Sequence, residues 1–145
     1  MIILLQRVSQ AAVVVEEQII GQIGAGLLLL LAVEPHDGIN EVVKLAERVL
    51  NYRVFADDAD KMNLSARDVQ AELLVVSQFT LAADTRKGLR PSFAQAAAPE
   101  QGLYYYEAFV TELQRSGLRV ATGQFGANMQ VSLINDGPVT FRLQV

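Results

Sequence analysis

The chain has 145 residues, of which 51% are hydrophobic and 19% charged, and its formal net charge at pH 7 is −4. This length suits one compact domain over residues 1–145, which buries roughly 70% of the surface of its unfolded chain. The acidic balance excludes a protein that coats nucleic acid through a broad basic surface, because such binding depends on neutralising many phosphates.

The residue types exclude several kinds of chemistry. Cysteine is absent, which removes disulfides and thiol nucleophiles. The only histidine, His36, lies in the turn sequence EPHDG and is expected to be solvated, so a serine triad lacks its base. No histidine and carboxylate cluster has ligand spacing, so we expect neither a metal nor a cofactor.

The amino-terminal third predicts strands. Short apolar segments at 2–8, 11–15 and 19–23 are typical of strands joined by tight turns. The glycine-rich GQIGAG at 21–26 is interpreted as a turn between strands, because a buried strand follows it, whereas a dinucleotide fingerprint opens a helix. The longest apolar run, Leu27 to Val33, is far shorter than the roughly 20 residues of a membrane span, and with no signal peptide evident we expect a cytoplasmic protein.

Two helices are predicted. The first follows Asp37, a plausible N-cap, and its apolar positions recur at helical spacing: Ile39, Val42, Val43, Ala46, Val49 and Leu50. The second begins near Pro99 and stops at Gly117, and its expected buried stripe consists of Leu103, Tyr106, Val110 and Leu113. Between them we expect a strand at 52–56 and a strand buried on both faces at 71–79.

From Leu118 onward the pattern returns to strands. Apolar residues alternate at 129–133 and again at 139–145. The intervening sequence INDGPVT, Ile134 to Thr140, contains the Asp-Gly signal of a hairpin turn, although Pro138 removes a backbone donor where a returning strand would begin. The order of strands and helices predicts an α/β fold, a single layered domain with mixed or antiparallel sheets and two main helices.

Polar residues mark one strand end as a candidate site. The buried strand at 71–79 delivers Ser77, Gln78 and Thr80, with Phe79 among them, where it opens into a loop. Such groups are often placed for ligands, and they also satisfy the last hydrogen bonds of a strand; both interpretations stay open. A local basic patch follows at Arg86, Lys87 and Arg90, either a solvated loop or a nucleic-acid contact.

Two long motifs make the sequence recognisable. SQFTLAADTRKGLRPSF at 77–93 and MQVSLINDGPVTF at 129–141 together resemble the D-aminoacyl-tRNA deacylases, and the resemblance runs from QRV at 6–8 to the terminal FRLQV. It implies that fold and an enzyme that hydrolyses the ester bond of D-aminoacyl-tRNA, and of mischarged glycyl-tRNA. It also implies a homodimer with active sites at the interface, whose partner is the aminoacylated 3′ end of tRNA.

The resemblance also implies residue roles. Ser77, Gln78, Phe79 and Thr80 match the pocket motif, and the amides near Phe79 and Thr80 suit the substrate carbonyl or its oxyanion. By the same resemblance Gly137 and Pro138 form a cis peptide that enters the partner's pocket and rejects L-amino acids. The remaining expected site residues are Arg7, which braces that segment; Phe125 and Met129, which line the adenosine pocket; and Arg86, Lys87 and Arg90, which contact tRNA phosphates.

The sequence is also compatible with two other functions. One is a deacylase of the same fold with a trans Gly137–Pro138 bond that acts on a small L-aminoacyl-tRNA. Another is a non-catalytic module that binds the tRNA end or a D-amino acid, because no acid–base dyad is evident. Thr80 as nucleophile and assistance by the ribose hydroxyl of the tRNA are both open, and we favour attack by water.

Overall fold

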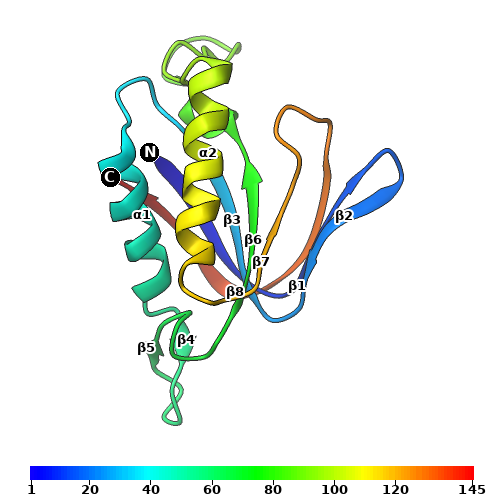
Figure 1. Cartoon of the computed structure of the whole chain (residues 1–145), viewed down its shortest axis with the longest axis vertical. Coiled ribbons are helices and arrows are strands. Elements are labelled where there is room, and N and C mark those ends of the chain that lie inside the picture. The colour runs from blue at the N-terminus through cyan, green and yellow to red at the C-terminus, as the bar shows by residue number, and fades with distance from the viewer.

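A computed structural model describes residues 1–145 (Figure 1). The chain forms eight strands, two α-helices and one short 3-10 helix, η1. In chain order they are β1 (Ile2–Val15), β2 (Gln18–Ile23), β3 (Gly26–Ala32), α1 (Ile39–Asn51), β4 (Phe55–Ala56), β5 (Met62–Leu64), β6 (Glu72–Ser77), η1 (Phe79–Ala82), α2 (Pro99–Gln114), β7 (Val120–Thr122) and β8 (Gln130–Gln144).

The main sheet is mixed, which confirms the predicted α/β class. Its order is β2-β1-β3-β6-β7, and β8 pairs with β1 as well. The strands β3, β6 and β7 run parallel, and β1 is antiparallel to β2, β3 and β8. Each parallel connection contains one helix, so α1 and α2 lie side by side on one face of the sheet (Figure 1).

The strand β1 is continuous where two strands were expected. Its first half, 2–8, pairs with β3, and its end, 11–15, pairs with β2. The predicted break between the two apolar segments is therefore a change of partner, and the backbone does not turn there. Pairing with β8 extends along nearly the whole of β1.

The main core lies between the helices and the sheet. Both helices bury a stripe, but each stripe is rotated from the predicted one. In α1 Ile39 and Val43 are 53% and 41% exposed, and Leu45 is fully buried instead. In α2 Leu103 is 38% exposed, whereas Phe109 is fully buried. None of the helices is long and apolar enough to cross a membrane.

Asp37 is not the N-cap of α1. Gly38 takes that position, and the Glu41 carboxylate accepts a hydrogen bond from the Gly38 amide at 3.0 Å. The buried Asp37 carboxylate instead pairs with the ammonium group of Met1 and accepts a hydrogen bond from the Glu34 amide at 2.6 Å. The carboxylate is thus used as a buried counter-ion, which the capping pattern did not reveal.

The turn between β1 and β2 has a backbone conformation that its two residues disfavour. Glu16 and Glu17 have φ angles of 47° and 64°, a region that glycine and asparagine tolerate better than glutamate. We expect the double change Glu16→Asn and Glu17→Gly to stabilise the fold by about 1 kcal/mol. Thermal unfolding of this variant should show a higher midpoint than wild type, and an unchanged or lower midpoint would contradict the expectation.

The predicted hairpin at Ile134–Thr140 is wrong. The two halves of β8 do not pair with each other, because both pair antiparallel with β1. Asn135 stands opposite Val8 and Thr140 opposite Gln6, so residues 136–139 face Arg7 alone and bulge out of the strand. The Asn135 side-chain amide donates to the carbonyls of Arg7 (2.8 Å) and Val139 (3.2 Å), which closes the base of the bulge.

Candidate active site

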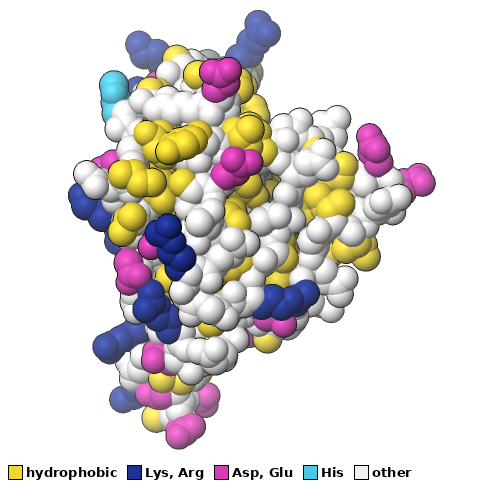
Figure 2. All heavy atoms as spheres, viewed as in Figure 1, with side chains coloured by type: hydrophobic (Ala, Val, Ile, Leu, Met, Phe, Trp, Pro, Cys, Tyr) yellow, Lys and Arg dark blue, Asp and Glu magenta, His cyan; other side chains and the backbone are white.

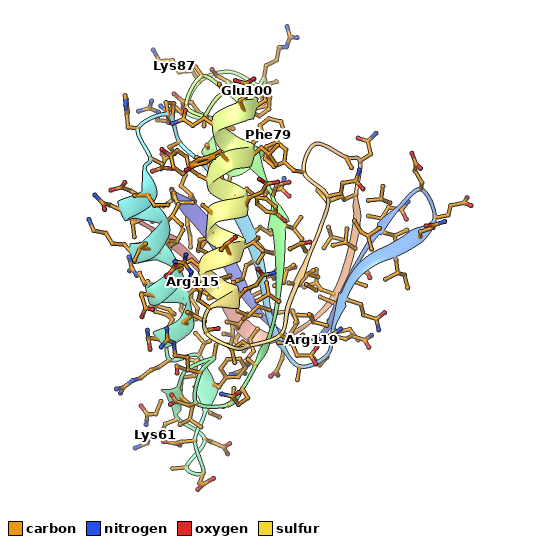
Figure 3. All side chains as sticks on the ribbon, in the orientation of Figure 1. Lys61, Phe79, Lys87, Glu100, Arg115 and Arg119 are labelled. Carbon is orange, nitrogen blue, oxygen red and sulfur yellow. The ribbon has the colours of Figure 1, made fainter.

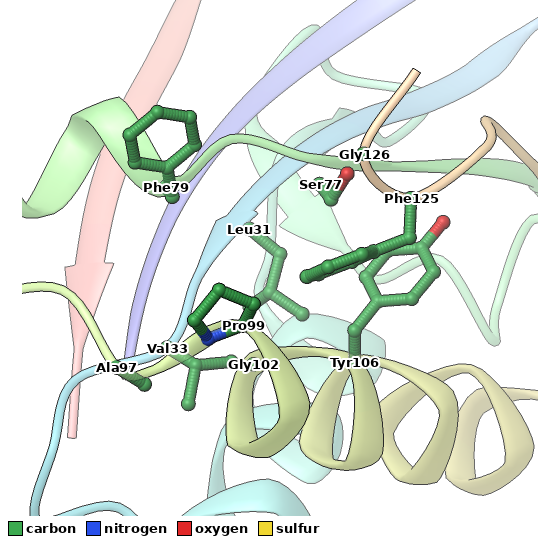
Figure 4. Close-up of a pocket in the computed structure, with 10 residues that line it drawn as sticks. All are labelled: Leu31, Val33, Ser77, Phe79, Ala97, Pro99, Gly102, Tyr106, Phe125 and Gly126. Atoms are coloured by element: carbon green, nitrogen blue, oxygen red, sulfur yellow. The ribbon is translucent and has the colours of Figure 1, made fainter.

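A pocket of about 270 Å³ opens at the carboxyl ends of the parallel strands β3 and β6 (Figure 4). Its walls come from the ends of these strands, from η1, from the first two turns of α2 and from the loop after β7. The lining residues are Leu31, Val33, Ser77, Phe79, Ala97, Pro99, Gly102, Tyr106, Phe125 and Gly126. Ligands commonly bind at this edge of a parallel sheet.

Of the expected segment Ser77–Thr80, Ser77 and Phe79 line this pocket, whereas Gln78 and Thr80 are not among its lining residues. The Gln78 amide donates to the Leu31 carbonyl at 2.7 Å, and the chain then turns into η1. The Gln78 side chain donates to the Thr80 hydroxyl at 2.5 Å. Because the first amides of a helix have no intrahelical acceptor, those of Phe79 and Thr80 are available to a ligand oxygen.

Phe79 stands at the pocket across from Phe125 (Figure 4). Its ring is 56% exposed and packs edge-on against Phe93, with ring centroids 5.1 Å apart. Asp84 and Ser92 exchange two backbone hydrogen bonds, 2.8 and 3.1 Å long, which close the loop directly before Phe93. The rim of the pocket is therefore apolar and accessible.

Tyr106 forms part of the pocket, a role that sequence reasoning missed. The hydroxyl group donates to the Val75 carbonyl at 2.9 Å, and burial raises the pKa of Tyr106 to about 12, which keeps this donor protonated. The Phe125 ring lies 5.8 Å from the Tyr106 ring, centroid to centroid. The helical stripe correctly predicted that Tyr106 is buried, but only the position of the loop after β7 makes it a pocket residue.

Met129 lies outside this pocket. It packs against a smaller apolar cluster that includes Val13, Ile23 and Val76, and its sulfur accepts a hydrogen bond from the Gln124 amide at 3.4 Å. Of the pair expected to line an adenosine site, the pocket contains Phe125 and not Met129.

Gly137 and Pro138 are exposed at the bulge of β8, and the peptide bond between them is cis. Arg7 reaches this bulge: its Nε lies 2.9 Å from the Asp136 carboxylate and donates to the Asp136 carbonyl at 3.2 Å. A side chain at position 137 would meet the Asn135 amide oxygen, since a Cβ built there lies 2.7 Å from it. A side chain at position 137 would therefore displace the Asn135 side chain that closes the bulge.

Within a single chain, the Gly137–Pro138 bulge does not reach the pocket. Arg7, opposite the bulge, pairs with Leu27 at the start of β3, whereas the pocket is lined by Leu31 and Val33 at its end. Leu27 and Leu31 are about 13 Å apart along the strand. No pocket residue comes from the bulge.

The three basic residues of the loop after η1 differ in whether they form an ion pair. Arg86 forms a bidentate pair with Asp84, at 2.9 and 2.7 Å, and these hydrogen bonds hold the pKa of the Asp84 carboxyl well below its usual range. Lys87 and Arg90 form no ion pair. The loop lies at the end of the molecule near Phe79, and basic side chains gather there (Figures 2 and 3).

The structure offers no metal cluster. No group of three or more His, Cys, Asp or Glu side chains could hold a metal ion, and His36 is exposed in its turn as predicted.

The family model D-Tyr-tRNA(Tyr) deacylase matches residues 4–144. The chain belongs to the D-Tyr-tRNA(Tyr) deacylase family. Proteins named D-aminoacyl-tRNA deacylase from Shewanella frigidimarina and Idiomarina loihiensis are 59% and 58% identical to this family member over 145 residues, which is all of each chain. The recognition from the two sequence motifs is therefore confirmed.

Solved structures agree with this deacylase family fold. A structure described as c-Myc DNA unwinding element binding protein is 40% identical, with a TM-score of 0.94 over 100% of this chain and 99% of that one. A second, described as a probable eukaryotic D-amino acid tRNA deacylase, is 17% identical, with a TM-score of 0.90 over 99% and 98% of the chains, and shows the fold alone.

Proposed function

We propose that this protein hydrolyses the ester bond of D-aminoacyl-tRNA and releases the free D-amino acid and tRNA. The observation that carries the proposal is the family match over residues 4–144, together with relatives of that name at 58–59% identity over their whole length. The position of Ser77 and Phe79 at a pocket supports it. A tRNA that is wrongly charged with glycine is a second proposed substrate, since glycine has no side chain that a chiral filter could reject.

The pocket suits the two ends of such a substrate. Its apolar walls around Phe125 would receive the terminal adenosine, and Met129 would support that wall from the adjoining loop. The acyl carbonyl would then lie near η1, where the amides of Phe79 and Thr80 can stabilise the oxyanion. Ser77 lines the pocket at the end of β6, and the Gln78 amide fixes the next residue through its bond to the Leu31 carbonyl.

The chemistry we propose is attack by water on an ester that is already activated. The water oxygen adds to the acyl carbon, the bond to the ribose oxygen breaks, and a proton passes to that oxygen with help from the neighbouring ribose hydroxyl. The protein contributes orientation and charge stabilisation. No histidine or other base lies beside Thr80, whose hydroxyl instead accepts the Gln78 hydrogen bond.

Thr80→Ala tests this mechanism. We expect the variant to keep its single-turnover rate constant within roughly threefold of wild type, because a hydroxyl without a base is a poor nucleophile. Single-turnover hydrolysis of D-tyrosyl-tRNA gives the rate, and mass spectrometry of the quenched enzyme looks for an acyl adduct. A trapped acyl-enzyme in wild type would overturn the water mechanism.

We also propose that the active unit is a homodimer in which the Gly137–Pro138 bulge of a second copy faces the pocket. The bulge is exposed, is braced by Arg7, and stands about 13 Å along β3 from the pocket of its own chain. A rigid backbone at the pocket would exclude an L side chain whatever its identity, and a D residue or glycine would fit. A side-chain pocket could not discriminate so generally.

Hydrolysis of D-tyrosyl-tRNA and L-tyrosyl-tRNA by the purified protein, with its mass in solution measured at the same concentration, tests both proposals. We expect rapid turnover of the D substrate, little of the L substrate, and a dimer mass. Equal rates would overturn the chiral filter, and preference for an L substrate would favour the same-fold alternative. Stoichiometric binding without turnover would favour a binding module.

Lys87 and Arg90 are our candidates for contacts with tRNA phosphates. The double variant Lys87→Glu, Arg90→Glu should raise KM for D-tyrosyl-tRNA about tenfold. Because each lost phosphate contact reduces the steepness, the logarithm of the tRNA binding constant should fall less steeply with the logarithm of the salt concentration, by about 1.8 in slope for two contacts. Arg86→Glu should have a smaller effect, because Asp84 already neutralises Arg86. Lys61→Glu, at the opposite end of the molecule (Figure 3), is the matched control. If Lys61→Glu changed KM and its salt dependence as much as the double change does, Lys87 and Arg90 would be solvated residues without a specific contact to tRNA.

A further inference from the structure

The loop after η1 is held in a defined shape by bonds within it. Asp84 and Ser92 exchange two backbone hydrogen bonds, which close its ends. The Asp84 carboxylate accepts three more hydrogen bonds from Arg86, one from the amide at 3.0 Å and two from the guanidinium at 2.9 and 2.7 Å. Gly88, midway between the closed ends, has a φ angle of 71°, a region that glycine adopts without strain. The tip of the loop is therefore formed by the chain itself.

Leu89 follows this glycine and is the most exposed large apolar residue of the protein. The accessible area of Leu89 is 104% of its reference value, and no core cluster contains it. A single exposed leucine is ordinary on a protein surface. At the tip of a loop that is closed by other residues, however, its side chain adds nothing to the fold, and it can contact another molecule with its whole surface.

Two cations without ion pairs stand on either side of this leucine. Lys87 and Arg90 are exposed and have no carboxylate partner, whereas Arg86 is neutralised by Asp84. Lys87 lies at the end of the molecule, where basic side chains gather although the chain as a whole is acidic (Figures 2 and 3). An apolar side chain between two cations complements an unpaired nucleic-acid strand, which presents base faces between its phosphates.

The tip of the loop is close to the pocket. Phe93, four residues after Leu89, packs against Phe79 at the pocket rim, with ring centroids 5.1 Å apart. Four residues span at most about 14 Å. A stacked strand advances roughly 3.4 Å per nucleotide, so Leu89 lies within about four nucleotides of the rim. The unpaired 3′ end of a tRNA has about this length.

We infer that Leu89 contacts the faces of the unpaired bases that precede the terminal adenosine of the tRNA, while Lys87 and Arg90 contact the phosphates on either side. This inference rests on the proposed function of the pocket, and it assigns to the loop the recognition of an unpaired tail. The loop touches no reacting atom, so substrate binding should depend on Leu89 and the chemical step should not.

Leu89→Ser tests the inference, with Met62→Ser as the matched control. Met62 is 48% exposed and follows Lys61, at the opposite end of the molecule (Figure 3). We expect Leu89→Ser to raise KM for D-tyrosyl-tRNA about fivefold, because an apolar contact is lost, and to leave kcat within about twofold of wild type. The salt dependence of tRNA binding should keep the wild-type slope, since leucine neutralises no phosphate. Met62→Ser should change neither KM nor the slope.

Binding of uncharged tRNA, measured by fluorescence anisotropy, gives a readout that does not depend on turnover. Leu89→Ser should bind the tRNA about fivefold more weakly than wild type. The two proteins should bind equally to a hairpin RNA with the same stem and a blunt end, because paired bases do not present their faces.

Three results would overturn the inference: an unchanged KM and tRNA affinity in Leu89→Ser, an equal loss of affinity for the blunt hairpin, or a lower mass in solution for the variant than for wild type. The last result would make Leu89 a contact between subunits. Absence of turnover by the wild-type protein would instead count against the proposed function.

Discussion

Arg7→Ala should lower kcat/KM for D-tyrosyl-tRNA by about 100-fold, since small misplacements of a positioning group cost rates of this order. The Arg7 guanidinium holds Asp136 through its carboxylate and its carbonyl, and it also donates to the Val54 carbonyl. Without it the Gly137–Pro138 bulge keeps the Asn135 bond to the β1 backbone but loses the side chain that holds Asp136. We expect discrimination against L-tyrosyl-tRNA to fall at the same time.

Arg142→Ala is the matched control for this experiment. Arg142 is exposed on the same strand, β8, and its side chain donates only to Gln144. Its removal should leave kcat/KM within twofold of wild type. Arg7→Lys should not restore activity, because an ammonium group cannot reproduce the planar fork of donors. An Arg7→Ala protein that is folded and retains both rate and selectivity would remove Arg7 from the proposed site.

Asp37→Asn should lower the free energy of unfolding by about 3 kcal/mol, because it leaves the buried ammonium group of Met1 without its closest counter-ion. Met1 is fully buried, and its remaining carboxylate partner, Glu34, lies at 3.2 Å and is more exposed. Urea unfolding of the two proteins gives the difference from the midpoints at equal slope. Asp58→Asn, an exposed carboxylate without an ion pair, should change stability by less than about 0.5 kcal/mol.

The sequence predicted the elements whose signals are local. Helical spacing between Asp37 and Asn51 identified α1, and Pro99 marked the start of α2. Periodicity could not define which side of each helix faces the sheet, since Ile39 and Val43 continue the apolar spacing and still lie outside. Which side of a helix is buried depends on how the helices and the sheet pack together, and that packing is not encoded in the local spacing.

The errors at Ile134–Thr140 have the same origin. Apolar alternation on both sides of Asp-Gly is equally compatible with a hairpin and with one strand that bulges against a third segment. The choice is decided by β1, which is remote in sequence and pairs with both halves. Asp37 was assigned as a cap because its ammonium partner, Met1, is also distant along the chain.

The candidate site was predictable in part. Ser77–Thr80 was located by a polar strand end and by family resemblance, and Phe125 by resemblance alone. Tyr106 and Gly102 carried no such signal, because a buried tyrosine and a helical glycine are ordinary in sequence. Their relation to Phe125 depends on how the loop after β7 packs on α2.

The pairing of β1 with β8 has a consequence for how the protein is made. Along most of one edge of β1, the backbone hydrogen-bonding groups pair only with β8, a strand from the opposite end of the sequence. The longest strand pairing of the sheet therefore joins the segments that are farthest apart in sequence. During synthesis β1 can pair early with β2 and β3, yet its other edge must wait for β8 to leave the ribosome. Non-local pairing of this kind slows folding and leaves an open strand edge in the nascent chain, where association with other chains competes with completion of the sheet.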